Sequence, residues 1–330
     1  MSAKIEPKSF LSVIKRYKMI RQPWIKCVLL VQDEILSALR DFLRSRGFVE
    51  ILAPIIGPAT DPGIRGAKQV SISYYGFRFK IMSSMILYKQ MAVSSLEKIF
   101  ALSPNIRLEP YESVATRRHL AEFRQVDVEQ AYASYIDVMK VAEQLVRYVC
   151  QRVKRACEDK LAYLKKKLRV PTTPFKKLTY QEAIEILKNK GFNMKYGEEI
   201  PWDAEKALSA MFNEPFFVID YPLTARGFYD REDPYRSGIL RDFDMLYPEG
   251  YGEAISGGER EYTYKDVLRR MRMKGDNPAE YKWYLEMLKD GIPPSAGFGI
   301  GVERLTRWIC GLENVWDAVP FPKVPGIASP

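Results

Sequence analysis

Histidine and cysteine are scarce in this sequence, and their scarcity excludes several kinds of site. Among 330 residues there is one histidine, His119, too few for most zinc sites or for a serine-histidine-aspartate triad. The N-terminal MSAKIEPKSF lacks the layout of a signal peptide, and no uncharged apolar run is long enough to cross a membrane. The cysteines have neither metal-ligand nor disulfide spacing; they are Cys27, Cys150, Cys157 and Cys310. We therefore expect a cytoplasmic protein without a membrane partner.

The composition is that of a globular protein with an excess of basic residues. Hydrophobic residues make up 47% of the chain, enough for one large domain or two smaller ones. The net charge of +10 is compatible with nucleic-acid binding. However, stretches such as 152–169 interleave basic, acidic and apolar residues, which is typical of solvated helix faces. We favour the second interpretation, and the first stays open.

The hydrophobic pattern predicts strands on both sides of a helical insertion. Helical spacing is clearest over 28–46 and in the long stretch 135–169, whereas 99–108 and 123–133 alternate like strands. Residues of about 150–215 read as a small helical insertion, and strand character returns at 216–222 and 242–248. This order predicts an α+β fold with an antiparallel sheet flanked by helices.

The segment GFGIGVER, which ends at Arg304, lies at a predicted strand-to-helix junction. Its three glycines alternate along the strand and leave one face bare, so that a flat ligand can lie against the backbone. Arg304 follows at the start of the helix, where backbone N–H groups favour an anion. Alone, such a segment is more often a packing feature than a nucleotide site.

Two further segments strengthen a nucleotide-binding interpretation. In the first, Arg107 and Glu109 share one strand face, and a loop then leads to Arg118, His119 and Phe123. Arginine can hold a phosphate with two hydrogen bonds, and an aromatic ring can stack on a base.

The second segment is GEAISGGERE, which places a carboxylate, Glu253, three residues before a hydroxyl, Ser256. Such a pair suits Mg²⁺ that carries a triphosphate. Each set alone could be an exposed ion pair or a loop, but the three segments together predict an ATP site.

With these motifs the sequence resembles the class II aminoacyl-tRNA synthetases, in particular the aspartyl and asparaginyl group. Pro54 after FVEIL resembles their first motif, IRLEP through EFRQVDVE the second, and GFGIGVERL with GLENVWDAVPFPK the third. The likeness covers roughly 28–150 and 220–325. It departs from the family in a longer loop between Arg107 and His119 and in Ile106, which replaces a phenylalanine.

The resemblance implies roles around the nucleotide. Arg107 would hold the α-phosphate, Glu109 the adenine amino group, and Phe123 would stack on adenine. Arg304 would lie near the γ-phosphate and adenine, and Gly301 would line the same site. Arg107, Arg260 and Arg304 are the expected catalytic residues.

It also implies a phosphate end and a metal site. Arg118 and His119 would approach the outer phosphates, while Glu253 and Ser256 would bind Mg²⁺. ATP and Mg²⁺ are accordingly the expected substrate and cofactor.

The amino-acid pocket is expected to hold aspartate. The helix SSMILYKQ resembles the aspartyl enzymes' QSPQLYKQ and keeps Ser84 and Lys89. Lys89 and Arg260 would meet a carboxylate, because a neutral carboxamide would leave two desolvated cations unpaired. Gln125 and Asp127 share a strand face that would meet the substrate ammonium. Gly299 completes the expected substrate-binding set.

The acceptor is expected to be ammonia. Only 27 residues precede the helix at 28–46, whereas the anticodon-binding β-barrel of the related synthetases has about a hundred. Residues 1–330 are thus expected to form a single catalytic domain without an anticodon-binding domain. The chain most resembles the archaeal-type asparagine synthetases, which implies asparagine synthesis from L-aspartate, ammonia and ATP through β-aspartyl-AMP.

Partners and alternatives follow from the same resemblance. A homodimer built on Pro54 and the 28–46 helix is expected, and tRNA is not an expected partner. One alternative is a truncated synthetase that aminoacylates tRNA or another acceptor. The other is a regulatory paralogue that binds ligand without catalysis.

Overall fold

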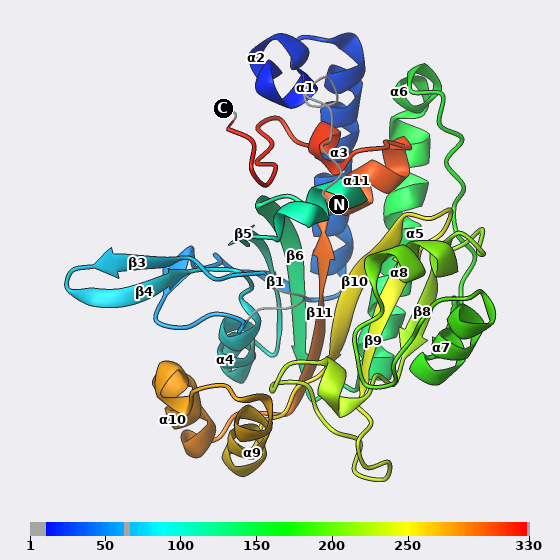
Figure 1. Ribbon diagram of the computed structural model, residues 1–330. Helices are drawn as coiled ribbons and strands as arrows, with labels where there is room; N and C mark the ends of the chain where they lie inside the picture. The colour runs from blue at the N-terminus through cyan, green and yellow to red at the C-terminus, as the bar shows by residue number, and fades with distance from the viewer. Residues whose placement is uncertain (1–10, 63–66, 329–330) are drawn as a thin grey trace.

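One large sheet organises the molecule (Figure 1). In the computed structural model, which describes residues 11–62 and 67–328, eight strands form this sheet in the order β1 (Val49–Glu50), β5 (Lys98–Ile106), β6 (Glu122–Ala131), β11 (Ser295–Gly301), β10 (Gly252–Glu259), β9 (Asp242–Tyr247), β8 (Phe216–Ile219) and β7 (Lys176–Thr179). Neighbouring strands from β5 to β8 are antiparallel, whereas β1 and β7 join the two edges in parallel. The predicted α+β class is confirmed, with parallel edge strands that the sequence pattern did not indicate.

Three helices cover one face of the sheet: α3 (Pro23–Ser45), α5 (Tyr135–Ala156) and α11 (Val302–Cys310). The apolar residues of α3 recur at helical spacing, as the sequence predicts, and the structure buries them against α5. A capping box of Ser134 and Asp137 starts α5, and Gly311, with a positive φ of 70°, ends α11. Val126 and Val128 of β6 point into this core, so the alternate residues of β6 face the other way.

The opposite face of the sheet carries the candidate site. There α4 (Ile86–Leu96) lies over β5 and β6. A small sheet of β2 (Ile56–Gly57), β4 (Phe77–Ile81) and β3 (Ser71–Tyr74) projects from the body as a long hairpin (Figure 1). Below α4, α9 (Tyr264–Lys274) and α10 (Lys282–Asp290) form a separate apolar cluster around Phe228 and Tyr284. The helix that the sequence analysis expects from SSMILYKQ onward is thus confirmed, but it starts three residues later, at Ile86.

The 150–215 segment is not purely helical, which corrects the sequence expectation. It holds the end of α5, then α6 (Glu158–Tyr163), α7 (Tyr180–Asn189) and α8 (Trp202–Ser209), but also β7, which extends the main sheet beside β8. A capping box of Thr179 and Glu182 starts α7 directly after β7. Strand β7 was missed because its four residues, KKLT, alternate too briefly to reveal a strand period.

The remaining elements are short. They are α1 (Leu11–Ile14), α2 (Arg16–Met19) and the 3₁₀ turns η2 (Tyr111–Thr116), η3 (Leu223–Ala225), η4 (Pro278–Tyr281) and η5 (Val315–Ala318). Arg16 is fully buried and donates to the backbone carbonyls of Val319 and Pro320, which ties α2 to the C-terminal segment. Within the described residues, none of the helices combines the length and the apolar character needed to span a bilayer.

Candidate active site

Glycines on β11 stand opposite the polar residues of β6, and this pairing creates the site. Gly297 pairs with Glu129, Gly299 with Asp127, and Gly301 with Gln125. A Cβ on Gly297 would lie 2.1 Å from a carboxylate oxygen of Glu129, and one on Gly299 would lie 3.2 Å from Asp127 Oδ1. The missing side chains of Gly297 and Gly299 on β11 therefore make room for the carboxylates of Glu129 and Asp127 on β6. Gly297 serves packing, and the prediction that all three glycines face a flat ligand is wrong for that position.

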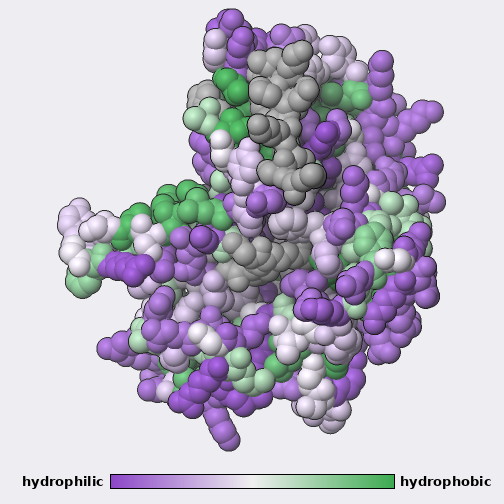
Figure 2. Space-filling model, in the orientation of Figure 1, coloured by the Kyte–Doolittle hydropathy of each residue, from purple (hydrophilic) through white to green (hydrophobic). Residues whose placement is uncertain are grey.

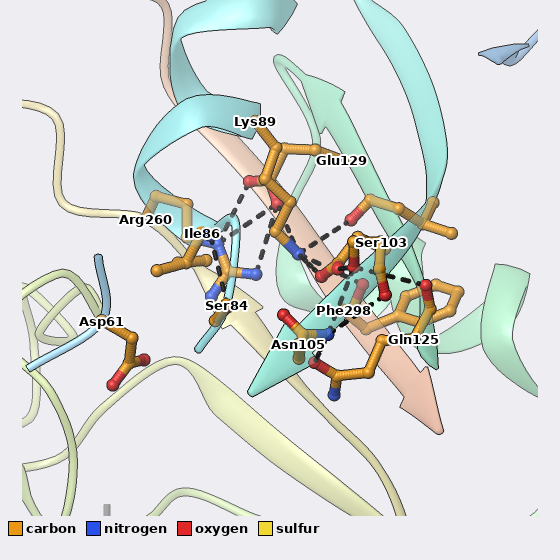
Figure 3. A network of polar contacts seen from close by, with 12 residues as sticks. Asp61, Ser84, Ile86, Lys89, Ser103, Asn105, Gln125, Glu129, Arg260 and Phe298 are labelled. Atoms are coloured by element: carbon orange, nitrogen blue, oxygen red, sulfur yellow. Dashed lines mark hydrogen bonds and ion pairs between the residues drawn. The ribbon is translucent and has the colours of Figure 1, made fainter. Parts of the chain in front are cut away.

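These carboxylates hold the two predicted cations (Figure 3). Lys89, on α4, is 2% exposed, and its Nζ lies 3.1 Å from Asp127 Oδ1 and 3.5 Å from Glu129 Oε2. It also donates to the carbonyl oxygen of Phe298 at 3.2 Å. A lysine ammonium has three N–H donors. Lys89 thus has no donor left for a ligand unless it releases one of these partners.

Arg260 is equally buried but keeps free capacity. Its Nε and Nη2 donate to Glu129, and its Nη1 donates to Asp230 Oδ1 at 3.3 Å. Burial opposes the charge of this guanidinium, but Glu129 and Asp230 outweigh it and raise the pKa of Arg260. Among residues 11–62 and 67–328, partners occupy three of its five N–H groups, which leaves two for a ligand. Because both cations already have carboxylate partners, a carboxamide would not leave them unpaired, and that argument for aspartate was wrong.

A second group of acidic residues, which the sequence reasoning missed, lies in the same cavity as Lys89 and Arg260. Arg226 stacks 3.8 Å from the centroid of the Tyr221 ring and pairs with Asp242 at 3.2 Å and Asp244 at 2.6 Å. Burial, with a smaller contribution from Asp230 against the opposing Arg226, raises the pKa of Asp242 to about 8. The alternation of acids with Phe243 on β9 is the one sequence signal that could have revealed this group.

Every predicted site residue lines one of two adjoining cavities. The amino-acid cavity, as we call the first, is lined by Ser84, Lys89, Gln125, Asp127, Arg260, Gly299, Arg107 and Ser256, besides Asp61, Arg226, Tyr229, Asp230 and Asp242. The nucleotide cavity is lined by Arg107, Glu109, Arg118, His119, Phe123, Gln125, Glu253, Gly299, Gly301, Glu303 and Arg304. Arg107, Gln125 and Gly299 line both, so the two cavities meet at these residues.

Arg107 is oriented at this junction by its neighbours. Its Nε donates to the carbonyl oxygen of Ser83 at 3.0 Å, and its guanidinium lies 5.1 Å from the centroid of the Phe123 ring. The terminal nitrogens of Arg107 can therefore face either cavity while the stem stays in place. Ser84, next to this anchor, accepts the N–H of Ile86, the first residue of α4, at 3.3 Å.

The far end of the nucleotide cavity is a network of opposite charges. Arg118 is buried, pairs with Glu205 of α8, and lies 3.5 Å from Glu253. Arg304 approaches the same Glu253 at 3.4 Å. His119 accepts or donates a 2.6 Å hydrogen bond with Thr116 through Nδ1. Glu205 was not predicted, and it shows that the 150–215 segment reaches the site.

The predicted magnesium pair is divided between the cavities. Glu253 lines the nucleotide cavity and Ser256 the amino-acid cavity. In the part of the chain that the structure describes, no three His, Cys, Asp or Glu side chains are grouped as metal ligands. Glu253 still fits one oxygen ligand of Mg²⁺, and phosphate oxygens could complete its shell.

Comparison with known proteins agrees with this geometry. The model of the family "tRNA synthetases class II (D, K and N)" matches residues 10–325. The chain is 37% identical over 317 residues to asparagine–tRNA ligase of Pyrococcus abyssi, covering 94% of this chain and 71% of that one. It is 34% identical over 309 residues to aspartate–tRNA(Asp/Asn) ligase of Methanopyrus kandleri, covering 92% and 69%.

A solved structure extends the likeness to the fold. Asparaginyl-tRNA synthetase of Pyrococcus horikoshii, complexed with asparaginyl-adenylate, superimposes with a TM-score of 0.90 at 35% identity, over 99% of this chain and 74% of that one. These relatives do not single out an asparagine synthetase, nor do they support the expectation that tRNA is no partner. The chain belongs to the class II tRNA synthetases of the D, K and N group, a family of ATP-using ligases.

Proposed function

We propose that this protein uses ATP to adenylate a carboxyl group of asparagine or aspartate. The observation that carries the proposal is the junction of the two cavities at Arg107, Gln125 and Gly299. The amino-acid cavity would hold the amino acid on one side of this junction, and the arginine-rich nucleotide cavity would hold ATP on the other. The two substrates would therefore meet at the junction. Holding two reactants in the right geometry can lower the barrier of such a transfer by about 7–11 kcal/mol.

The proposed reaction is an in-line displacement at the α-phosphorus. A carboxylate oxygen of the amino acid attacks this phosphorus, an acyl–O–P bond forms, and the bond to the β-phosphate oxygen breaks to release pyrophosphate. Arg107 lies where charge develops on the α-phosphoryl group and stabilises it electrostatically. Phe123 and Glu109 would hold the adenine, while Arg118, His119 and Arg304 would hold the outer phosphates.

Mg²⁺ is proposed at the Glu253 end of the nucleotide cavity. There it would neutralise part of the negative charge of the phosphates. Arg118 and Arg304, which both approach Glu253, would neutralise the rest. Ser256, on the amino-acid side, would take part only through a phosphate group that spans both cavities.

The proposed acceptor of the activated group is tRNA. Relatives at 34–37% identity carry names of tRNA ligases of asparagine and aspartate, which supports this acceptor over ammonia.

Asparagine synthesis from aspartate and ammonia is the second candidate, and the unused N–H groups of Arg260 support it. Lys89 lines the amino-acid cavity together with Arg260, as the helix of the aspartyl enzymes implies. Arg260 could hold the α-carboxylate of aspartate and present its β-carboxylate to Arg107. Ammonia would then attack the β-acyl carbon of the resulting β-aspartyl-AMP, forming asparagine and releasing AMP.

A set of four incubations separates the candidates. The protein receives ATP and Mg²⁺ with either labelled asparagine or labelled aspartate, and then either tRNA or ammonium. Acid-precipitable label with tRNA supports the first candidate, whereas free labelled asparagine from aspartate and ammonium supports the second. Absence of both products, with no release of AMP, would favour a regulatory paralogue.

We also propose that residues 1–330 act as one catalytic unit and pair as a homodimer. The pairing of β7 with β8 and the contact of Glu205 with Arg118 support the first point. For the second, Leu52 is 98% and Ile55 63% exposed beside Pro54, an unusual exposure for apolar side chains. Figure 2 shows further apolar surface along the β3–β4 projection.

A further inference from the structure

A third cavity of about 870 Å³ adjoins the nucleotide cavity, and no predicted role covers it. It lies between the loop at 115–118 and the start of α8, and α11 contributes Arg307 to its wall. Arg118 lines this cavity and the nucleotide cavity alike, so the two are neighbours at the end where the outer phosphates of ATP are proposed to lie.

Basic side chains form a track from one cavity into the other. Arg304 and Arg307 are three residues apart on α11, so they project from the same side of the helix, one turn apart. Arg118 lies between the two cavities, and Arg117 and Lys206 line the larger one.

Arg307 has unused binding capacity among these cations. Its Nε donates to the carbonyl oxygen of Glu313 at 3.1 Å, and its guanidinium lies 5.0 Å from the centroid of the Tyr251 ring. Within residues 11–62 and 67–328 it forms no ion pair. Burial lowers the pKa of Arg307 to about 10, and the charges of Arg118, Arg304 and Arg117 add to this effect. An anion beside Arg307 would relieve the repulsion.

The carboxylates of the same cavity do not neutralise Arg307. Glu313 pairs with Arg117, and Glu199 pairs with Arg226 at 2.9 Å. Asp203 accepts the backbone N–H of Ala204 at 2.9 Å. A multiply charged anion therefore fits best next to Arg307 and Lys206.

We propose that this cavity receives inorganic pyrophosphate as it leaves the nucleotide cavity, with Arg307 as the side chain that holds it. The inference rests on the proposed adenylation, which produces pyrophosphate next to Arg118. The track Arg304, Arg118, Arg307 offers the departing anion successive cationic partners and separates it from the acyl-adenylate.

The test compares Arg307→Gln with the wild-type protein in amino-acid-dependent exchange of pyrophosphate into ATP. Losing one charge-assisted contact is expected to raise KM for pyrophosphate about tenfold. KM for ATP, measured from AMP formation, should change less than about twofold, since Arg307 does not line the nucleotide cavity. Arg272→Gln, on the exposed side of α9, is the matched control and should change neither constant.

Further outcomes decide against the inference. An unchanged KM for pyrophosphate, an equal rise in KM for ATP, or a rise only in KM for tRNA would each overturn it. Lys206→Ala, an exposed position, gives a second variant if Arg307→Gln does not fold. If the wild-type protein shows no exchange, the proposed function fails; calorimetric titration of both proteins with pyrophosphate then still tests the site, and equal binding would refute it.

Discussion

Replacement of Arg260 by lysine offers the sharpest test of how the amino-acid cavity works. The lysine keeps the positive charge between Glu129 and Asp230 but lacks the planar fork. In the structure, three N–H groups of Arg260 hold these two carboxylates and two remain for a ligand. A lysine has only three donors in all, so the contacts to the ligand are the ones expected to be lost.

The magnitude follows from the number of lost contacts. A hydrogen bond to a charged group contributes about 1.5–3 kcal/mol. Losing one such contact therefore raises KM for the amino acid by about tenfold to a hundredfold, at about 1.4 kcal/mol per factor of ten. KM for ATP should stay within about twofold, because Arg260 lines only the amino-acid cavity.

The assay is pyrophosphate exchange with each substrate varied at saturation of the other. Arg260→Ala serves as a contrast: it leaves Glu129, which is 0% exposed, without its main partner and should cost about 3–5 kcal/mol of folding free energy. Equal rises in both KM values for Arg260→Lys would refute the assigned role, as would an unchanged KM for the amino acid.

Three other substitutions test separate parts of the account. Leu52→Asp is expected to weaken dimerisation at least about a hundredfold, because a two-fold interface loses two apolar contacts of about 1.5–3 kcal/mol each. Analytical ultracentrifugation measures this change. A wild-type protein that forms no dimer, or a variant that dimerises equally well, would refute the prediction. Gly299→Ala adds a Cβ 3.2 Å from Asp127 Oδ1 at the cavity junction and should lower kcat/KM for exchange by about tenfold or more. An unchanged kcat/KM would contradict the assigned junction. The pKa of Asp242 is about 8 in the folded protein, above its value in the unfolded chain, so its protonation stabilises the folded state. This stabilisation is lost, and Tm falls, as pH rises from about 4 to about 8. Asp242→Asn should make this fall in Tm smaller, and an unaltered dependence of Tm on pH would disprove the prediction.

The sequence predicted the strands and helices that carry strong periodicity or motifs. Alternation on β6 placed Gln125 and Asp127 on one face, and the structure has Asp127 and Glu129, two residues further on, turned together toward Lys89. Strand β10 was described only as a motif, because its glycines conceal the alternation. Gly257 is required there, since a Cβ would lie 2.6 Å from the carbonyl oxygen of Gly297 on the next strand.

The partners of the predicted residues could not be inferred from local sequence. Glu205 meets Arg118 across 87 residues of chain, and Glu129 meets Arg260 across 131. Such pairs depend on the order of strands in the sheet, which periodicity does not encode. For this reason Arg118 and Arg260 were predicted, whereas Glu205, Glu129 and Asp230, which pair with them, were not. The argument that a carboxamide would leave the cations of the amino-acid cavity unpaired failed for the same reason.

The central claim is that the protein adenylates asparagine or aspartate with ATP, the two substrates lying in the two adjoining cavities. The most direct measurement is exchange of labelled pyrophosphate into ATP by the wild-type protein with asparagine, aspartate, glutamine or no amino acid. The account predicts exchange that depends on asparagine or aspartate and is abolished by Arg107→Ala, a residue that lines both cavities. Absence of exchange with either amino acid, or exchange that glutamine supports equally well, would contradict it.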